Sequence, residues 1–239
     1  GRRSAGQTTL RGFLDHMPGD HVNVVAENQK GLTAFAKLAQ EMGCQRPVRG
    51  ATLSGRDDFT KCGTVFFPVP GFTSAAWRRQ RFGAQRCSLV GITHTVSTRR
   101  VVEMLMTSMI EPIESWDAII CTSKAVRSVV ARQFELQTAY LQKRFGAARV
   151  PLPQLPVIPL GVDAKSFARS DAYRKEMRDR FDVPDDAIVI MTMGRLTIGE
   201  KANPVPMYQV LEQLAQRLSR PVHLWQVGWA SRDDERKLY

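Results

Sequence analysis

The chain has 239 residues, of which 43% are hydrophobic and 24% are charged, and this is ordinary globular composition with room for one large domain or two modest ones. No apolar run approaches the roughly 20 residues that a bilayer span requires, and the first residues lack the apolar core of a signal peptide. The composition therefore excludes a transmembrane class, and we expect a cytoplasmic protein.

The formal net charge is +11, and most of the excess lies in the first two thirds of the chain. Residues 1–163 carry 21 basic and 12 acidic residues, a net +9, whereas residues 164–239 carry 13 and 11, a net +2. Such a bias is typical of proteins that meet nucleic acid, an anionic membrane or an acidic substrate. No RNP, zinc-finger or basic-zipper pattern is present, so we expect no nucleic acid partner.

Four arginines crowd around one short predicted helix: Arg78, Arg79, Arg81 and Arg86. An exposed cluster of this kind predicts peripheral association with the anionic inner face of the membrane. A solvated basic face without a partner is the alternative. The cluster would not bind a membrane if its guanidinium groups pair with Asp57, Asp58 or other acidic residues.

The cysteines show no C-x-x-C spacing, which predicts reduced thiols and no metal site. They are Cys44, Cys62, Cys87 and Cys121.

Hydrophobic periodicity predicts strands and helices that alternate along the chain. We predict helices at 8–16, 32–42, 74–82, 98–113, 123–145 and 173–181, with Ser123 as the cap of the fifth, and a further helix opened by Asn203 and Pro204. We predict strands at 21–26, near 51–53, at 64–69, 88–93 and 117–121, a short one at 157–158, and two more from 188 and at 222–227. This order predicts an α/β fold with parallel, doubly wound sheets. The proline-rich connector and the charge break predict two lobes, 1–163 and 164–239.

The strand predicted from residue 188 breaks at Gly194, and two cationic residues, Arg195 and Lys201, lie in the short loop that follows. This order of a strand, a glycine, a cationic loop and a helix is typical of phosphate-binding sites at the carboxyl end of a sheet in α/β proteins. Arginine offers a planar fork and lysine a point charge, which together suit a diphosphate. No Walker or G-x-G-x-x-G pattern is met.

Four motifs occur in an order that resembles the retaining glycosyltransferases of family 4. Ala5-Gly6 resembles the glycine-rich first loop of the acceptor domain, and Gly91-Ile-Thr-His94-Thr95 resembles the histidine motif at the interdomain cleft. Ile158-Pro-Leu-Gly-Val-Asp163, with Phe167 downstream, resembles Pro-Asn-Gly-Val-Asp-x-x-x-Phe, with Leu160 in place of Asn. Met193-Gly-Arg195 and Lys201 resemble the first loop of the donor domain.

The resemblance implies a GT-B-like fold of two Rossmann-type parallel-sheet lobes: an N-terminal acceptor-side domain and the first part of a nucleotide-sugar donor domain. Both lobes are expected to be truncated, because the first acceptor-domain strand is missing and the family's Glu-x7-Glu motif would lie beyond Tyr239. A fragment of this kind would hold a donor weakly and be inactive alone. Asp163 is expected to be a turn or hinge residue between the lobes.

The implied activity is transfer of a hexose from a nucleotide-diphosphate sugar to an unidentified glycan, lipid or small-molecule acceptor, with retention and without a metal or cofactor. By the resemblance, His94, Arg195 and Lys201 are the catalytic candidates, and Gly6, Thr95 and Gly194 join Arg195 and Lys201 around the donor. Thr93 would supply a further hydroxyl. The alternatives are a GT-B-fold nucleotide-sugar epimerase and a non-catalytic nucleotide-binding or interaction module, because a fold does not fix a function.

Overall fold

The structure is a computed structural model that describes residues 4–54, 58–72, 74–162, 164–199, 201, 203–230 and 232–239. The chain divides into two compact units, Gly1–Asp163 and Ala164–Tyr239. We call them the N-terminal unit and the C-terminal unit. Both combine helices with parallel strands, so the predicted α/β class is confirmed.

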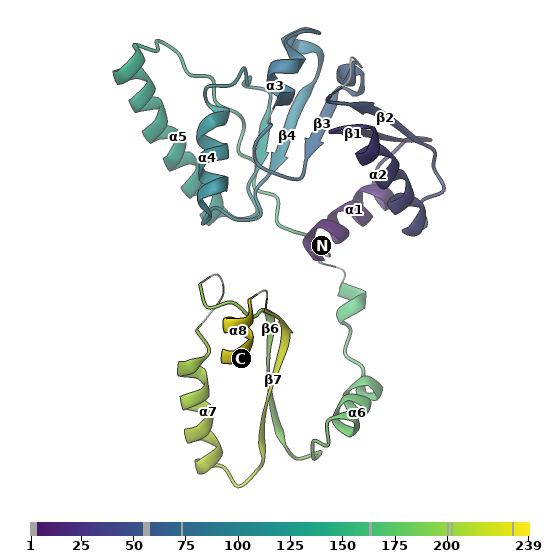
Figure 1. The fold of residues 1–239 in the computed structure, drawn as a ribbon, viewed down its shortest axis with the longest axis vertical. Coiled ribbons are helices and arrows are strands. Elements are labelled where there is room, and N and C mark those ends of the chain that lie inside the picture. The colour runs from purple at the N-terminus through teal and green to yellow at the C-terminus, as the bar shows by residue number, and fades with distance from the viewer. Residues whose placement is uncertain are drawn as a thin grey trace. The chain divides into compact units, whose positions relative to one another are not determined.

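The N-terminal unit alternates strands and helices, as Figure 1 shows. Its elements are α1 (Ser4–His16), β1 (Val22–Ala26), α2 (Gln29–Glu41), β2 (Val48–Thr52), η1 (Phe59–Cys62), β3 (Thr64–Phe67), α3 (Ser74–Arg79), η2 (Ala84–Arg86), β4 (Ser88–Ile92), α4 (Arg99–Ser108), β5 (Ala118–Ile120) and α5 (Lys124–Phe145). The strands form two parallel sheets, β1-β2 and β3-β4-β5.

One face of the β3-β4-β5 sheet carries the main core. The odd-numbered residues Val65, Leu89 and Ile119 are buried there against helices α4 and α5, which contribute Leu105 and Val130 among others. Because side chains alternate along a strand, the even-numbered residues face the other way, toward α1. On that side the rings of Phe13 and Phe66 lie 4.8 Å apart.

A buried ion pair joins α3 to the start of β5. Arg79 and Asp117 are both fully buried, and the two guanidinium NH groups of Arg79 donate to the two carboxylate oxygens of Asp117 at 2.6 and 2.7 Å. The same carboxylate accepts from the backbone N–H groups of Leu89 and Glu114, each at 2.8 Å. The fold therefore supplies partners for both carboxylate oxygens, while the Nε of Arg79 is buried without a hydrogen-bond partner among the described residues.

The C-terminal unit contains η3 (Ala164–Phe167), α6 (Asp171–Arg180), β6 (Ile188–Arg195), α7 (Val205–Arg217), β7 (Val222–Trp229) and α8 (Asp233–Leu238). β6 and β7 pair in parallel and are connected by α7, so the three elements form a βαβ unit. The hydroxyl of Tyr208 on α7 donates to the side-chain oxygen of Gln226 on β7 at 2.8 Å, and this bond ties the helix to one face of the strands.

Several local predictions were wrong. Helix α1 begins at Ser4, so Gly6 lies inside its first turn and not in a loop before the helix. Residues 157–158 form an isolated bridge from Val157 to Cys121 and no strand. Pro204, not Asn203, is the N-cap of α7, although the Asn203 side chain still accepts from the N–H of Val205. Helix α8 was not predicted.

Glu111, just after α4, carries a carboxyl group whose burial can be tested. Burial raises its pKa from 4.5 to about 7, and its Oε2 atom is buried with no hydrogen-bond partner among the described residues. Between those two pKa values the unfolded chain releases the proton that the folded chain keeps, so the free energy of unfolding falls as pH rises through that window.

Replacing Glu111→Gln is expected to remove this contribution. Urea unfolding of both proteins from pH 4 to pH 8 should show a stability difference that grows in favour of the variant until about pH 7 and is constant above it. A difference that does not change with pH would contradict the burial of an ionising carboxyl.

Candidate functional site

The turn after β6 holds the two predicted loop cations. β6 ends at Arg195, and the N–H of Leu196 donates to the carbonyl of Trp229 at 3.0 Å. The chain then folds back, because the N–H of Thr197 donates to the carbonyl of Arg195 and the N–H of Lys201 donates to the carbonyl of Thr197, both at 3.1 Å. Arg195 and Lys201 are both exposed. The structure thus brings these cations into one hydrogen-bonded turn.

Glycine is required at the base of this turn. Gly194 has a φ of 154°, which favours glycine. It pairs in register with Gly228, where a Cβ atom would lie 1.8 Å from the carbonyl oxygen of Gly194. The two strands approach closely just before Arg195, whose register partner is Trp229 with 56% of its surface exposed.

Thr197 is a candidate that the sequence analysis missed. It lies between the two cations, is only 6% exposed, and its hydroxyl has no hydrogen-bond partner in the part of the chain that the structure describes. A buried hydroxyl without a partner costs free energy. The signal in the sequence was a hydroxyl residue two positions after Arg195.

The histidine motif lies at the carboxyl end of β4. His94 is exposed two residues after the strand. Thr93 is fully buried and its hydroxyl donates to the carbonyl of Ile120 at 3.1 Å, so that hydroxyl is occupied within the fold. The Thr95 and Ser97 hydroxyls lie 2.9 Å apart and shape the turn that leads to α4. Gly91 permits close packing, since a Cβ atom there would lie 2.6 Å from the carbonyl oxygen of Val69.

A cavity of about 620 Å³ lies on the α1 side of the β3-β4-β5 sheet. Thr8 and Thr9 of α1 line it together with Ile158–Gly161 of the Pro-Leu-Gly motif. Ile92 of the histidine motif also lines it, so two of the four sequence motifs meet around one cavity within the N-terminal unit. Gly6 is exposed and does not line it. Asp163, the predicted hinge residue, lies outside the described residues, and Phe167 is 71% exposed.

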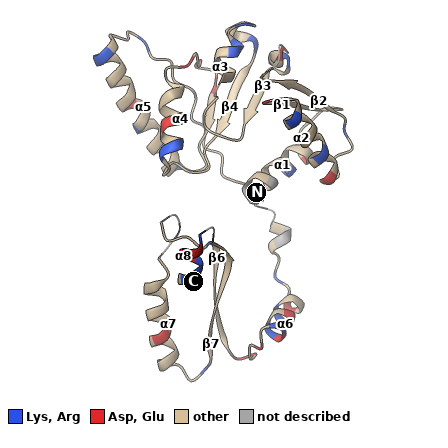
Figure 2. Ribbon diagram, viewed as in Figure 1, with Lys and Arg blue, Asp and Glu red and all other residues tan. Residues whose placement is uncertain are grey.

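The arginine cluster around α3 is largely internal. Arg78 and Arg79 are buried, Arg79 is held by Asp117, and Arg86 lies 3.4 Å from the Asp58 carboxylate. Asp57 lies outside the described residues. Figure 2 shows further basic residues of the unit on α1, α2, α4 and α5, among other places. The structure therefore leaves no four-arginine surface at α3.

The cysteines are all unpaired. In the described ranges, no three His, Cys, Asp or Glu side chains are placed to hold a metal ion together. No helix in those ranges is long and apolar enough to cross a membrane. Comparisons with protein-family models, with curated proteins and with solved structures found no match for this chain.

Proposed function

We propose that this protein transfers a sugar from a nucleotide-diphosphate sugar to an acceptor with retention of anomeric configuration, on a GT-B-like fold. The observation that carries the proposal is the turn after β6. It presents Arg195 and Lys201 at the carboxyl end of a parallel strand, immediately before helix α7. This is the position at which α/β sheets bind ligands.

The chemical requirement is to stabilise the negative charge that grows on the diphosphate as it leaves. Fixed cations in a cleft that excludes water stabilise such charge by several kcal/mol, and they need no metal ion for this task. In the proposal Arg195 binds two phosphate oxygens with its fork, and Lys201 neutralises a third. The Thr197 hydroxyl would gain a partner if the turn adjusts around an anion.

His94 is the proposed contact to the transferred sugar. It is exposed at the carboxyl end of β4, and an imidazole nitrogen can form a hydrogen bond with a sugar hydroxyl. The acceptor is a glycan, a lipid or a small molecule. The net +9 charge of residues 1–163 would favour an anionic acceptor or the inner membrane surface.

Incubation of the full-length protein with UDP- and GDP-linked hexoses, followed by proton NMR, tests the proposal. We expect release of nucleoside diphosphate from at least one donor and a first-formed sugar product with the donor's anomeric configuration, and we expect slower release from His94→Ala. An inverted product, or no turnover of any donor, would contradict it. A hexose that changes configuration at another carbon would instead identify an epimerase.

A further inference from the structure

The carboxyl end of α5 carries exposed apolar side chains. Leu136, Tyr140 and Phe145 are 56%, 53% and 69% exposed. Leu136 and Tyr140 are four positions apart and therefore lie on the same side of the helix, and the rings of Tyr140 and Phe145 lie nearly perpendicular, with 6.2 Å between their centroids. The side of α5 that packs into the core is a different one, which includes Phe134 and Leu141. We call the three exposed side chains the α5 tip.

Positive charge surrounds the α5 tip. Lys143 and Arg144 lie in the last turn of α5, and Arg149 lies in the loop that follows. Figure 2 shows basic residues at both places, and these three are the only charged residues between positions 136 and 162. In the described ranges none of them forms an ion pair, whereas Arg132 pairs with Glu135 at 3.1 Å. Cations in the last turn stabilise their helix, but Arg149 lies beyond it, so helix stability alone does not explain this charge.

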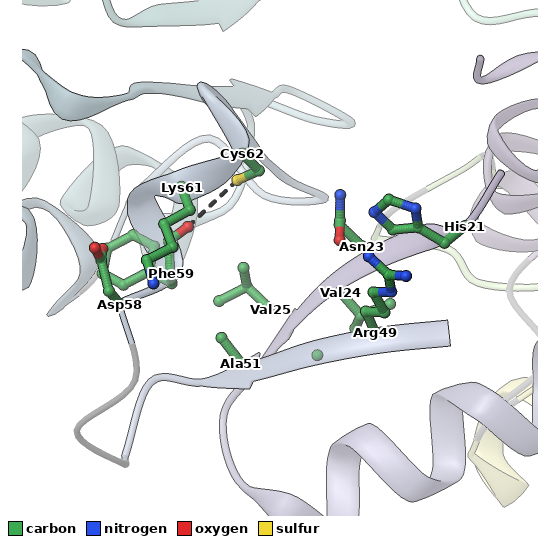
Figure 3. A pocket seen from close by; sticks show the side chains of 11 residues that line it. His21, Asn23, Val24, Val25, Arg49, Ala51, Asp58, Phe59, Lys61 and Cys62 are labelled. Carbon is green, nitrogen blue, oxygen red and sulfur yellow. Dashed lines mark hydrogen bonds between the residues drawn. The ribbon is translucent and has the colours of Figure 1, made fainter. Parts of the chain in front are cut away.

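A second basic region of the N-terminal unit has no such excess of positive charge. Arg49 and Lys61 line a cavity of about 310 Å³ between β1, β2 and η1, and His21 and Asp58 line it with them (Figure 3). The carboxylate of Asp20 bonds to the ring of His21. The two cations, Arg49 and Lys61, are therefore balanced by the carboxylates of Asp20 and Asp58. The basic residues of this cavity thus form no surface for an anionic partner.

The α5 tip lies at the amino edge of the β3-β4-β5 sheet. α4 follows β4 and α5 follows β5, and the chain after α5 pairs in parallel with β5 again at Gln154, so both helices run back toward the amino ends of the strands (Figure 1). Ile110, exposed just after α4, and Trp116, exposed just before β5, lie at the same edge. His94 follows the carboxyl end of β4, at the opposite edge. A partner at the α5 tip therefore leaves the surroundings of His94 open.

This combination of side chains matches the boundary of an anionic bilayer. Tyrosine places its ring among apolar groups and its hydroxyl in water, as at membrane interfaces, and lysine and arginine are attracted to anionic headgroups. Lys143 lies on the same side of α5 as Leu136 and Tyr140, because it follows them by seven and three positions. Lysine is depleted in protein–protein interfaces but is common in helices that lie in a membrane interface. The arrangement therefore favours a lipid surface over a protein partner.

We propose that the α5 tip binds the surface of an anionic lipid bilayer. The rings of Tyr140 and Phe145 would enter the headgroup region. Lys143, Arg144 and Arg149 would pair with the charged headgroups. This contact is distinct from the one expected at α3, whose arginines are largely internal. It does not rest on the proposed sugar transfer, because the candidate site takes no part in it.

Sedimentation of the full-length protein with phosphatidylcholine vesicles that contain phosphatidylserine, and with vesicles of phosphatidylcholine alone, tests this proposal. At about 0.1 M salt we expect binding to the anionic vesicles to be at least about tenfold stronger than to the neutral ones. Lys143→Gln with Arg149→Gln should weaken binding to the anionic vesicles at least about tenfold. Lys124→Gln with Arg127→Gln is the matched control and should change it less than about threefold, because these exposed cations lie near the amino end of α5, more than about 20 Å away along the helix.

A second pair of variants tests the aromatic part of the contact. Tyr140→Ser with Phe145→Ser should weaken binding to the anionic vesicles at least about tenfold, because it removes the apolar surface that would enter the headgroup region. Tyr173→Ser, which changes an exposed aromatic residue of the C-terminal unit, should bind as the wild type does. No binding, equal binding to the two kinds of vesicle, or equal losses in the two charge variants would overturn the proposal. So would a dimer in solution that Tyr140→Ser with Phe145→Ser dissociates, because the α5 tip would then be a contact between copies of this chain.

Discussion

Replacing Asp117 with alanine is expected to lower the free energy of unfolding by about 3–5 kcal/mol. The variant leaves the Arg79 guanidinium buried without its counter-charge, since the remaining acceptors of Arg79 are the carbonyls of Cys87 and Pro112. It also removes the acceptor for the N–H groups of Leu89 and Glu114. Buried donors that lose their acceptor bear the full cost of desolvation.

Two controls separate a buried charge from a general effect of substitution. Glu103→Ala breaks an exposed pair, in which Arg99 and Glu103 are 91% and 58% exposed, and should change stability by less than about 1 kcal/mol. The double variant Arg79→Met with Asp117→Leu should be more stable than Asp117→Ala, because it removes both charges. Urea unfolding followed by circular dichroism measures all three. If Asp117→Ala is as stable as Glu103→Ala, the ion pair does not hold α3 to β5.

Elements with local start and stop signals could be predicted from the sequence. Helix α5 runs from Lys124 to Phe145, as expected, because the Ser123 hydroxyl accepts from the N–H of Val126 and Gly146 ends the helix in a left-handed conformation. The parallel strands β4 and β6 were predicted from continuous apolar runs. Both kinds of signal lie within a few residues of the element that they define.

Features that depend on distant residues could not be predicted in this way. The nearby residues Arg78 and Arg81 suggest that Arg79 belongs to a surface cluster. The prediction fails because its partner, Asp117, lies 38 positions away in the chain. Helix α8 has no apolar periodicity, and what favours it is the charge order of Asp233–Glu235 in the first turn and Arg236 and Lys237 in the last.

The candidate site shows the same division. Gly194, Arg195 and Lys201 were identified from sequence because a strand, a break and two cations are adjacent in the chain. The need for Gly228 depends on the pairing of β6 with β7, and the burial of the Thr197 hydroxyl is a property of the folded turn, so neither was foreseen. The assignment of this turn to a donor diphosphate stays a prediction.

Replacing Arg195 or Lys201 with alanine is expected to weaken nucleoside diphosphate binding by about 1.5–3 kcal/mol each, or roughly 10–150-fold. Each variant removes one charge-assisted bond to a phosphate oxygen. The two effects should not simply add, because both cations act on the same diphosphate and lie in one hydrogen-bonded turn. Arg217→Ala is the matched control, since this exposed arginine ends α7, at the opposite end of the strands from Arg195.

The dissociation constants of UDP and GDP for the wild type, Arg195→Ala, Lys201→Ala and Arg217→Ala, measured by isothermal titration calorimetry at one fixed ionic strength, test the donor site most directly. We predict that at least one of the two nucleotides binds the wild type and Arg217→Ala equally and binds Arg195→Ala and Lys201→Ala at least about tenfold more weakly. Equal binding to all four proteins, or no binding of either nucleotide to the wild type, would contradict a diphosphate site at the carboxyl end of β6.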